Sequence, residues 1–359
     1  MKAAVYHQAK TPLTIENVDI DDPRGREVLV RTMASGVCHS DLHFVDGLYP
    51  LAGPAVLGHE AAGIVEKIGP QVTEFKPGDH VIACLSVFCG QCERCLTGQT
   101  HLCMKRPARG ADEPPRLSFN GTPTGQFASV ASYAEYMLLH ENGVVKMDND
   151  MPFAQAALIG CGVTTGVGAA LKTAKVEPGS TAVVFGAGGV GLSAIQGCRI
   201  AGARMIIAVD MVEHKLATAR ELGATHSIDA SIEDPIQKIH ELTGGGADYA
   251  FEAIGLKKVA EQCWEAIRPG GLATIIGMIP VGENVEIPGA SFLREKKIQG
   301  SSMGSNSFKV DMPRYIELYR QGRLRLDEMI TKRSPLEDIN DRFRAMKDGE
   351  VARSVIMFD

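Results

Sequence analysis

Residues 181–191 read TAVVFGAGGVG, an apolar run that leads directly into a glycine-rich turn. The turn matches the spacing G-x-G-x-x-G, and residues 190–201 after it have a helical pattern. Asp210 lies 19 residues beyond Gly191, at the end of the next apolar run. A strand, a glycine turn, a helix and a second strand that ends in an acidic residue are typical of a dinucleotide-binding unit.

Each part of this unit has a chemical role in such a site. Glycines let the backbone turn tightly and approach a pyrophosphate, whose charge the helix N-terminus favours. The Asp210 carboxylate would accept hydrogen bonds from the adenosine ribose and repel a 2′-phosphate, which predicts NAD rather than NADP. Lys215, one helical turn further along, could contact the same ribose. The alternative is a turn that only packs helix against strand. The turn residues expected to contact the cofactor are Gly186, Gly188, Gly189, Val190 and Gly191.

The sequence on either side of this unit predicts a two-domain α/β protein. Beyond about residue 175, strands (181–185, 205–209, 227–228, 249–252, 272–276 and 297–300) alternate with helices (190–201, 213–222, 235–242 and 257–267). This alternation is typical of a doubly wound parallel sheet. Residues 1–150 instead contain short β-type runs separated by Gly and Pro turns, which favours an antiparallel region. Its clearest runs are 28–31, 61–68, 80–84, 134–139 and 144–147.

The last part of the chain is expected to return to the antiparallel region. Two helical stretches, 313–321 and 336–348, precede a short closing strand, 354–358. We therefore predict one domain from residues 1–162 and 305–359, with a metal-binding lobe at 85–105, and a nucleotide-binding domain at 163–304. The polar stretch 105–124 is predicted to be a long surface loop.

Six of the nine cysteines are candidate metal ligands. Four of them, Cys89, Cys92, Cys95 and Cys103, occupy one short stretch, and four thiolates can surround a tetrahedral Zn²⁺ in a closed site. Cys38 and Cys161 stand far apart with His59 between them; two thiolates and an imidazole leave a fourth zinc position open. The alternative is that these three are core residues. Cys84, Cys198 and Cys263 have no such spacing and are expected to be buried small residues.

Bulk composition narrows the class of protein. The chain has 359 residues, a net charge of −6 and 45% apolar residues, as in a soluble globular protein without a nucleic-acid or anionic-membrane partner. The N-terminal residues lack the pattern of a signal segment, and no apolar run approaches the ~20 residues of a membrane span. Closely spaced cysteines in such a chain are expected to be reduced and metal-bound. We predict a cytoplasmic protein.

Several strings together resemble one family over essentially the whole length of the chain. They are GVCHSDLH, LGHEAAGIVEKIG, PGDHVI, CGQCERC, IGCGVTTG, VFGAGGVG and VDMVEHK. The resemblance is to the zinc-containing alcohol dehydrogenases of the medium-chain dehydrogenase/reductase superfamily. It implies a GroES-like β-rich catalytic domain, a Rossmann NAD-binding domain, two zinc ions per chain and a homodimer or homotetramer.

The resemblance also implies residue roles. Cys38, His59 and Cys161 would bind the catalytic zinc, with Glu60 behind it as a spare ligand, and the four clustered cysteines would bind the structural zinc. A proton relay would run from the substrate oxygen through Ser40, a cofactor ribose hydroxyl and His43 to water. Further residues would contact or orient these groups. They are Asp41 on the zinc histidine, His39 and Arg353 at the cofactor phosphates, and Thr165 near the nicotinamide.

The family implies reversible oxidation of an alcohol to an aldehyde by hydride transfer to NAD. Tyr49, Leu85 and Phe88 would form an apolar pocket for medium-chain or aromatic primary alcohols, although such residues equally serve a core. An alternative is a glutathione-adduct (formaldehyde) dehydrogenase, for which Arg106, Arg109 and Arg116 could meet glutathione carboxylates. The sequence is also compatible with an alcohol:acceptor oxidoreductase that keeps NAD permanently bound, and with a non-catalytic zinc- and nucleotide-binding homologue.

Overall fold

The computed structural model of the chain describes residues 1–107 and 115–359. The chain forms two compact units. The first unit contains Met1–Cys161, Ser307–Arg320 and Ile330–Asp359, and the second contains Gly162–Asn306 and Gln321–Met329. From the sequence, the stretch Gln321–Met329 was expected in the first domain, but it belongs to the second unit. The Gln196 side-chain amide holds it there, because its nitrogen donates to Arg325 O at 3.0 Å and its oxygen accepts from Arg325 N at 2.7 Å.

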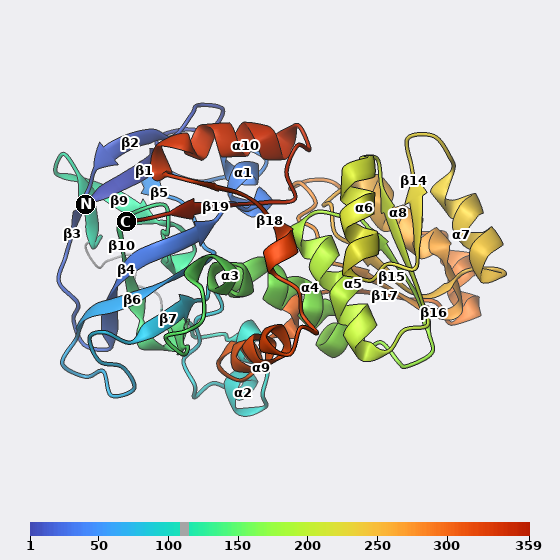
Figure 1. Cartoon of the computed structure of the whole chain (residues 1–359), viewed down its shortest axis with the longest axis horizontal. Helices are drawn as coiled ribbons and strands as arrows, with labels where there is room; N and C mark the ends of the chain where they lie inside the picture. The colour runs from blue at the N-terminus through green and yellow to red at the C-terminus, as the bar shows by residue number, and fades with distance from the viewer. Residues whose placement is uncertain (108–114) are drawn as a thin grey trace. The chain divides into compact units, whose positions relative to one another are not determined.

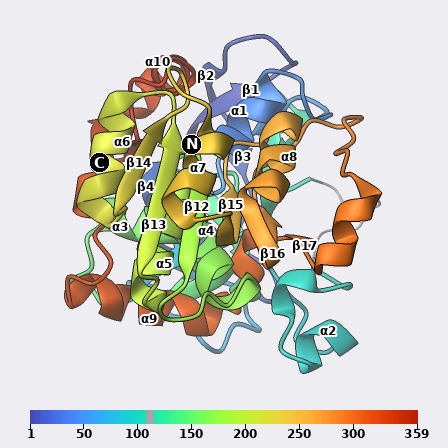
Figure 2. The same ribbon diagram turned by 90° about the vertical axis from the view of Figure 1, so that its right-hand side faces the viewer.

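The second unit contains a parallel sheet with the strand order β14-β13-β12-β15-β16-β17, which confirms the predicted doubly wound architecture (Figure 2). Helices α5 and α6 cover one face of the sheet, and α7 and α8 cover the other (Figure 1). The strands are β12 (Thr181–Phe185), β13 (Met205–Asp210), β14 (His226–Asp229), β15 (Ala247–Glu252), β16 (Ile267–Ile275) and β17 (Lys297–Gly300). The helices are α4 (Thr164–Gly168), α5 (Gly189–Ala201), α6 (Glu213–Leu222), α7 (Pro235–Thr243) and α8 (Lys257–Ala266).

Local chemistry accounts for these elements. The strands alternate with amphipathic helices whose apolar residues, such as Ile239 and Trp264, pack on the buried valines and isoleucines of the sheet. Helix α7 begins where the Asp234 carboxylate accepts hydrogen bonds from Ile236 N and Gln237 N, and ends at Gly244, which has a φ of +69°. Most predicted bounds differ from the observed ones by a few residues.

The first unit consists of two sheets and their covering helices. One sheet has the order β2-β1-β5-β9-β8-β3, and the other has the order β11-β7-β6-β4-β19-β18 with β10 paired to β4. Strand β19 pairs with β4, so the C-terminal end of the chain joins the N-terminal region as predicted. The strands are β1 (Lys2–Tyr6), β2 (Thr14–Asn17), β3 (Asp19–Ile20), β4 (Glu27–Gly36), β5 (Ala55–Val56), β6 (Ala61–Ile68), β7 (His80–Ala83), β8 (Leu117–Phe119), β9 (Thr122–Gln126), β10 (Tyr136–His140), β11 (Val144–Lys146), β18 (Ile330–Ser334) and β19 (Arg353–Met357). The α-helices are α1 (His39–Val45), α2 (Glu93–Leu96), α3 (Phe153–Leu158), α9 (Phe308–Arg320) and α10 (Ile339–Lys347).

Three sequence-based expectations need correction. The stretch 105–124, expected to be a loop, contains β8 and the beginning of β9, which pair as a hairpin around Asn120-Gly121. Helix α9 begins at Phe308 rather than at residue 313, because Phe308 and Met312 belong to its buried face. The expectation that no apolar run approaches the length of a membrane span is wrong: the continuous helical segment Phe153–Thr173 is long and apolar enough for one, but 94% of its apolar window is buried, as in a core helix.

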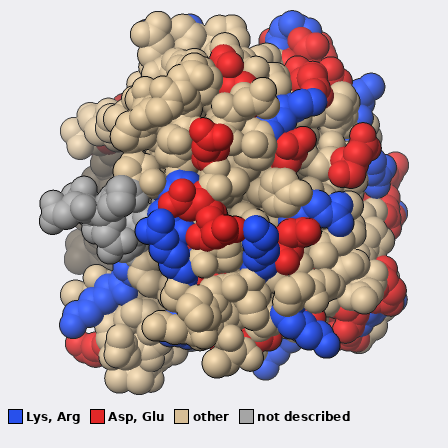
Figure 3. Space-filling model, turned by 90° about the vertical axis from the view of Figure 1, so that its left-hand side faces the viewer, with Lys and Arg blue, Asp and Glu red and all other residues tan. Residues whose placement is uncertain are grey.

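Charged side chains on the face of the first unit drawn in Figure 3 alternate in sign. Ion pairs of this unit include Lys67 Nζ with Asp22 Oδ1 at 2.7 Å and Lys2 Nζ with Glu337 Oε1 at 2.8 Å. Exposed pairs of this kind contribute little to stability, because water and salt screen their attraction. The face in Figure 3 therefore carries mixed charge rather than one extended patch of a single sign.

Candidate active site

Cys38, His59 and Cys161 meet in the interior of the first unit. Their ligand atoms lie within 4.8 Å of one another, and all three residues are buried. His59 Nε2 is 3.2 Å from Cys161 Sγ. Three segments that are remote in the sequence thus bring two sulfurs and one imidazole nitrogen together, as expected.

The fold explains how these segments converge. Cys38 follows β4, and His59 precedes β6, the antiparallel neighbour of β4. A hydrogen bond from Gly36 N to Glu60 O, 2.7 Å long, joins the ends of the two strands. Cys161 lies in a π-helical turn, Ile159–Val163, between α3 and α4. Such widened turns are frequent at functional sites because they re-aim a side chain.

The donor set fits Zn²⁺, which takes thiolate and imidazole ligands in a tetrahedral arrangement. His59 Nδ1 faces Asp41 Oδ1 at 3.1 Å, so Nε2 is the nitrogen directed at the sulfurs. The Cys161 thiol, together with His59, holds the pKa of Cys38 well below its usual value. Burial disfavours a charged His59, yet Asp41 and Cys38 raise its pKa well above the ordinary range. The His59 ring thus lies between the Asp41 carboxylate and the Cys38 sulfur, two groups that attract a cation.

Asp41 is fully buried and accepts hydrogen bonds at both carboxylate oxygens. Its Oδ1 accepts from Gly58 N at 3.0 Å and also faces His59, the residue that the family resemblance implies Asp41 orients. Its Oδ2 accepts from the Tyr133 hydroxyl at 2.9 Å. Burial, followed by the charge of Asp41, raises the pKa of Tyr133 well above its usual value, so the phenol stays protonated and donates. Sequence reasoning missed Tyr133, because it lies far along the chain from Asp41.

Glu60, the residue after His59, forms a buried ion pair with Arg353. Burial raises the pKa of Glu60 to about 7, and the Arg353 guanidinium opposes this shift. A Cβ at Gly36 would lie 2.7 Å from Glu60 Cδ, so the glycine makes room for the carboxyl group. Arg353, predicted to contact a cofactor phosphate, directs its guanidinium at Glu60 in this structure; the phosphate contact stays a prediction.

The predicted proton relay residues lie on α1, directly after Cys38. Ser40 is partly exposed in the first turn of this helix, and His43 lies in its last turn. Burial lowers the pKa of His43, which keeps its imidazole neutral near pH 7 and able to accept a proton. His39 is exposed, with its ring 6.2 Å from that of His43. Thr165 lies in the second unit, where its hydroxyl donates to Met303 Sδ at 3.3 Å.

A run of aromatic rings connects the metal ligand His59 to His43. The ring of Phe127 is 5.9 Å from the His59 imidazole and 4.8 Å from Phe44, and Phe127 also packs against the core cluster that contains Leu57 and Tyr133. Phe44 is 5.6 Å from Tyr49, which is 6.1 Å from His43. We call Phe127, Phe44 and Tyr49 the aromatic wall. Only Tyr49 was expected here, because Phe44 and Phe127 carry no motif.

The remaining two candidate wall residues pack into the first unit. Leu85 lies against a core cluster of β4, β6 and β7 residues, and the Phe88 ring lies 5.8 Å from that of buried Phe308. Leu85 and Phe88 therefore pack as core residues, the alternative to lining a substrate pocket.

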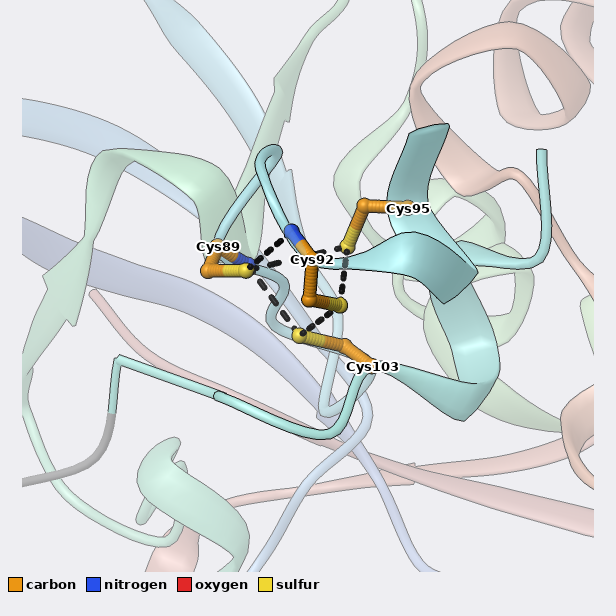
Figure 4. A group of neighbouring side chains, drawn as sticks. All are labelled: Cys89, Cys92, Cys95 and Cys103. Atoms are coloured by element: carbon orange, nitrogen blue, oxygen red, sulfur yellow. Dashed lines mark hydrogen bonds between the residues drawn. The ribbon is translucent and has the colours of Figure 1, made fainter. Parts of the chain in front are cut away.

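The four clustered cysteines form a second candidate metal site (Figure 4). Their sulfurs point toward one another: Cys92 Sγ lies 3.5 Å from Cys95 Sγ and 3.9 Å from Cys103 Sγ, and Cys89 Sγ lies 3.9 Å from Cys95 Sγ. Backbone N–H groups of Cys89 and Cys92 donate to Cys103 Sγ and Cys89 Sγ, both at 3.3 Å, which stabilises thiolates. This donor set matches a closed structural zinc site.

The glycine turn in the second unit has the geometry for a bound pyrophosphate. A Cβ at Gly191 would lie 1.7 Å from Gly186 O, so helix and turn pack too closely for any other residue. A Cβ at Gly188, the residue before α5, would meet nothing within 4 Å, which leaves the N-terminus of this helix open to a ligand.

Asp210 ends β13 beside this turn. Its Oδ2 accepts from Ala187 N at 2.7 Å, and its Oδ1 accepts from Met211 N at 2.8 Å and from Val212 N at 3.1 Å. The residues present therefore fit a dinucleotide, and three backbone N–H groups hold the Asp210 carboxylate in place; its contact with a ribose stays a prediction. Lys215 follows in the first turn of α6 and is partly buried.

Two of the three arginines that could meet glutathione carboxylates already bond to other groups of the chain. Arg116 is buried and pairs with Asp21 Oδ2 at 2.9 Å and with Glu27 Oε2 at 2.7 Å. Arg106 Nη2 donates to His101 O at 3.0 Å. Arg109 lies outside the described residues.

Comparison with known proteins gives close matches over the whole chain. Residues 24–149 match the family model "alcohol dehydrogenase GroES-like domain", and residues 189–320 match "zinc-binding dehydrogenase". The S-(hydroxymethyl)glutathione dehydrogenase of Paracoccus denitrificans is 39% identical over 372 residues, covering 99% of each chain. The benzyl alcohol dehydrogenase of Acinetobacter calcoaceticus superposes with a TM-score of 0.94 at 35% identity, covering 100% of this chain and 99% of its own. An alcohol dehydrogenase zinc-binding domain protein of Burkholderia ambifaria gives a TM-score of 0.94 at 38% identity, covering 100% and 98%.

Proposed function

Because this chain belongs to the zinc-containing alcohol dehydrogenases, which are zinc-dependent and use NAD, we propose that it reversibly oxidises medium-chain or aromatic primary alcohols to aldehydes. The observation that carries the choice of substrate is the aromatic wall, which begins 5.9 Å from the imidazole of the metal ligand His59. Aromatic side chains beside a reactive centre favour apolar or aromatic substrates. A structure of the same fold, 35% identical, is named a benzyl alcohol dehydrogenase.

The roles of this chain's residues in the reaction follow from the site. Cys38, His59 and Cys161 would hold the zinc, which when bound supplies a Lewis acid that lowers the pKa of an alcohol. The Ser40 hydroxyl, two residues from Cys38, would take the alcohol proton while giving up its own, and the neutral His43 imidazole would accept the released proton and pass it to solvent. The aromatic wall would orient the carbon chain and exclude water. The glycine turn of the second unit, with the acidic residue that ends β13, would bind NAD, which accepts the hydride.

The alternative that a comparison favours is oxidation of S-(hydroxymethyl)glutathione, the activity named for the Paracoccus relative. Against it, Arg116 is buried in ion pairs and Arg106 is bonded to a backbone carbonyl. The two substrate classes are separated by initial rates of NADH formation with benzyl alcohol, with hexanol, and with formaldehyde plus glutathione, zinc being quantified on the same sample. Our proposal predicts that benzyl alcohol or hexanol has the higher kcat/KM. A preference for the glutathione adduct would contradict it. NADH that forms only as a single turnover would instead indicate permanently bound cofactor.

Removing the first ring of the aromatic wall tests the substrate pocket. We expect Phe127→Ala to lower kcat/KM for benzyl alcohol by about 10- to 100-fold, because the pocket loses apolar contact with the substrate ring. The kcat/KM for ethanol should change by less than about 3-fold, since ethanol is too small to use that contact. Phe119→Ala is the matched control, because its ring lies against His7, outside the wall. Equal losses for the two alcohols would count against the pocket.

Cofactor choice can be tested at the end of β13. We expect Asp210→Asn to lower the ratio of kcat/KM for NAD to that for NADP by about 10- to 100-fold, because the charge that repels a 2′-phosphate is lost while an acceptor oxygen remains. Asp229→Asn is the control: Asp229 ends the neighbouring strand in register with Asp210, and its carboxylate bonds only to Ser231 among the described contacts. An unchanged ratio in Asp210→Asn would remove this residue from cofactor selection.

A further inference from the structure

Residues 127–133 approach the metal ligand His59 from two directions. At one end, the Phe127 ring packs edge-on against the His59 imidazole, 5.9 Å away. At the opposite end, the Tyr133 hydroxyl donates to Asp41 Oδ2 at 2.9 Å, and Asp41 Oδ1 faces His59 Nδ1 at 3.1 Å. A single segment therefore contacts the ring and also the carboxylate that orients it.

The backbone holds this segment firmly beside His59. Ser132 N donates to Gly58 O and Tyr133 N donates to Leu57 O, each at 3.0 Å. The contact is close: a Cβ at Gly58 would lie 2.7 Å from Tyr133 N. The side chain is equally constrained, because Tyr133 is fully buried and its ring lies 6.0 Å from that of Phe343. The phenol oxygen therefore has a defined position relative to Asp41.

Backbone strain is concentrated in the same segment. Ala128, Ser129 and Ala131 have φ values of +53°, +58° and +58°, in the left-handed region that non-glycine residues rarely adopt. Strained conformations persist where the surrounding structure over-determines them, and they cluster at active sites and ligand clamps. These residues lie between Phe127 and Tyr133, the two side chains that approach His59.

The chemistry of a buried carboxylate explains what the phenol contributes. A carboxylate taken out of water needs hydrogen-bond donors at both oxygens to stay charged and ordered. Gly58 N and His59 Nδ1 serve Oδ1, and the Tyr133 hydroxyl serves Oδ2. A carboxylate fixed in this way keeps the proton of His59 on Nδ1 and leaves the Nε2 lone pair for a metal.

We propose that Tyr133 is a positioning residue for the catalytic zinc: its hydroxyl fixes the Asp41 carboxylate, which in turn directs His59 Nε2 toward Cys38 and Cys161. Tyr133 itself touches neither metal nor substrate. The inference rests on the zinc site and is independent of which alcohol the enzyme prefers, so a different substrate would leave it intact.

The test compares two buried tyrosines that differ in the partner of the hydroxyl. Tyr133→Phe removes the bond to Asp41 together with a 3.4 Å contact to Gly36 O, whereas Tyr6→Phe removes only a 3.4 Å contact to Leu51 O within the same core cluster, so the two variants differ by the Asp41 bond. Zinc release from the holoenzyme to excess chelator is followed with time. In Tyr133→Phe, we expect one of the two zinc ions per chain to leave about 10-fold faster than in the parent, with the release of the second ion unchanged. Tyr6→Phe should behave like the parent in both phases.

Thermal unfolding of both variants separates positioning from stability. Similar falls in Tm combined with a zinc-release change confined to Tyr133→Phe would support the proposal. Equal zinc release in parent, Tyr133→Phe and Tyr6→Phe would overturn it. A double-mutant cycle with Asp41→Asn tests the pathway: the effect of Tyr133→Phe should shrink when the carboxylate charge is already gone, and independent, multiplying effects would show that Tyr133 does not act through Asp41.

Discussion

Cys38→Ser should lower kcat/KM for benzyl alcohol by about 10³-fold or more and reduce the zinc content from two ions to one per chain. The thiolate of Cys38 is one of three protein ligands whose atoms lie within 4.8 Å of one another. Serine is a far poorer zinc ligand, and two remaining ligands do not hold the metal. A Lewis acid of this kind contributes several kcal/mol to the reaction, and about 1.4 kcal/mol corresponds to each tenfold in rate.

Cys84→Ser provides the matched control. Cys84 is also buried in the first unit, but it belongs to neither cysteine cluster, and burial raises the pKa of its thiol to about 11. This variant should keep two zinc ions and most of the activity. NAD binding to Cys38→Ser, measured by fluorescence titration, should match the parent, because the glycine turn lies in the second unit. If Cys38→Ser keeps both zinc ions and its rate, the proposed centre is not where the reaction occurs.

Ser40→Ala should lower kcat for alcohol oxidation by about 10²-fold or more, since an alcohol proton then has no acceptor in the site. Ser40 stands on the first turn of α1, two residues after Cys38, and His43 lies on the last turn of the same short helix. The effect should appear in kcat more than in zinc content, because Ser40 is not a ligand.

Ser40→Thr is the conservative comparison, because threonine keeps the hydroxyl. This variant should retain activity within about 10-fold of the parent, and stopped-flow measurement of the first turnover would show whether the chemical step is the one affected. Similar losses in Ser40→Ala and Ser40→Thr would mean that the side chain serves packing rather than proton transfer.

Much of the fold could be predicted from local patterns. The strand, glycine turn and helix around residues 181–191 form as expected, because glycine conformations and the alternation of apolar runs are properties of neighbouring residues. The four-cysteine site was equally predictable, since its members lie within one short stretch. Local patterns were insufficient at residues 105–124, where β8 and β9 are held by pairing with each other and with strands distant in sequence.

Local sequence patterns were enough to predict the parallel-sheet unit, the glycine turn with its acidic partner and the four-cysteine site, because each depends on residues close together in the chain. Grouping Cys38 with His59 and Cys161 already needed a family resemblance. Only three-dimensional packing brings Tyr133 to Asp41, Phe127 to Phe44 and Arg353 to Glu60. The partners in each of these pairs are tens to hundreds of residues apart, and their positions depend on how strands and helices pack rather than on any local preference.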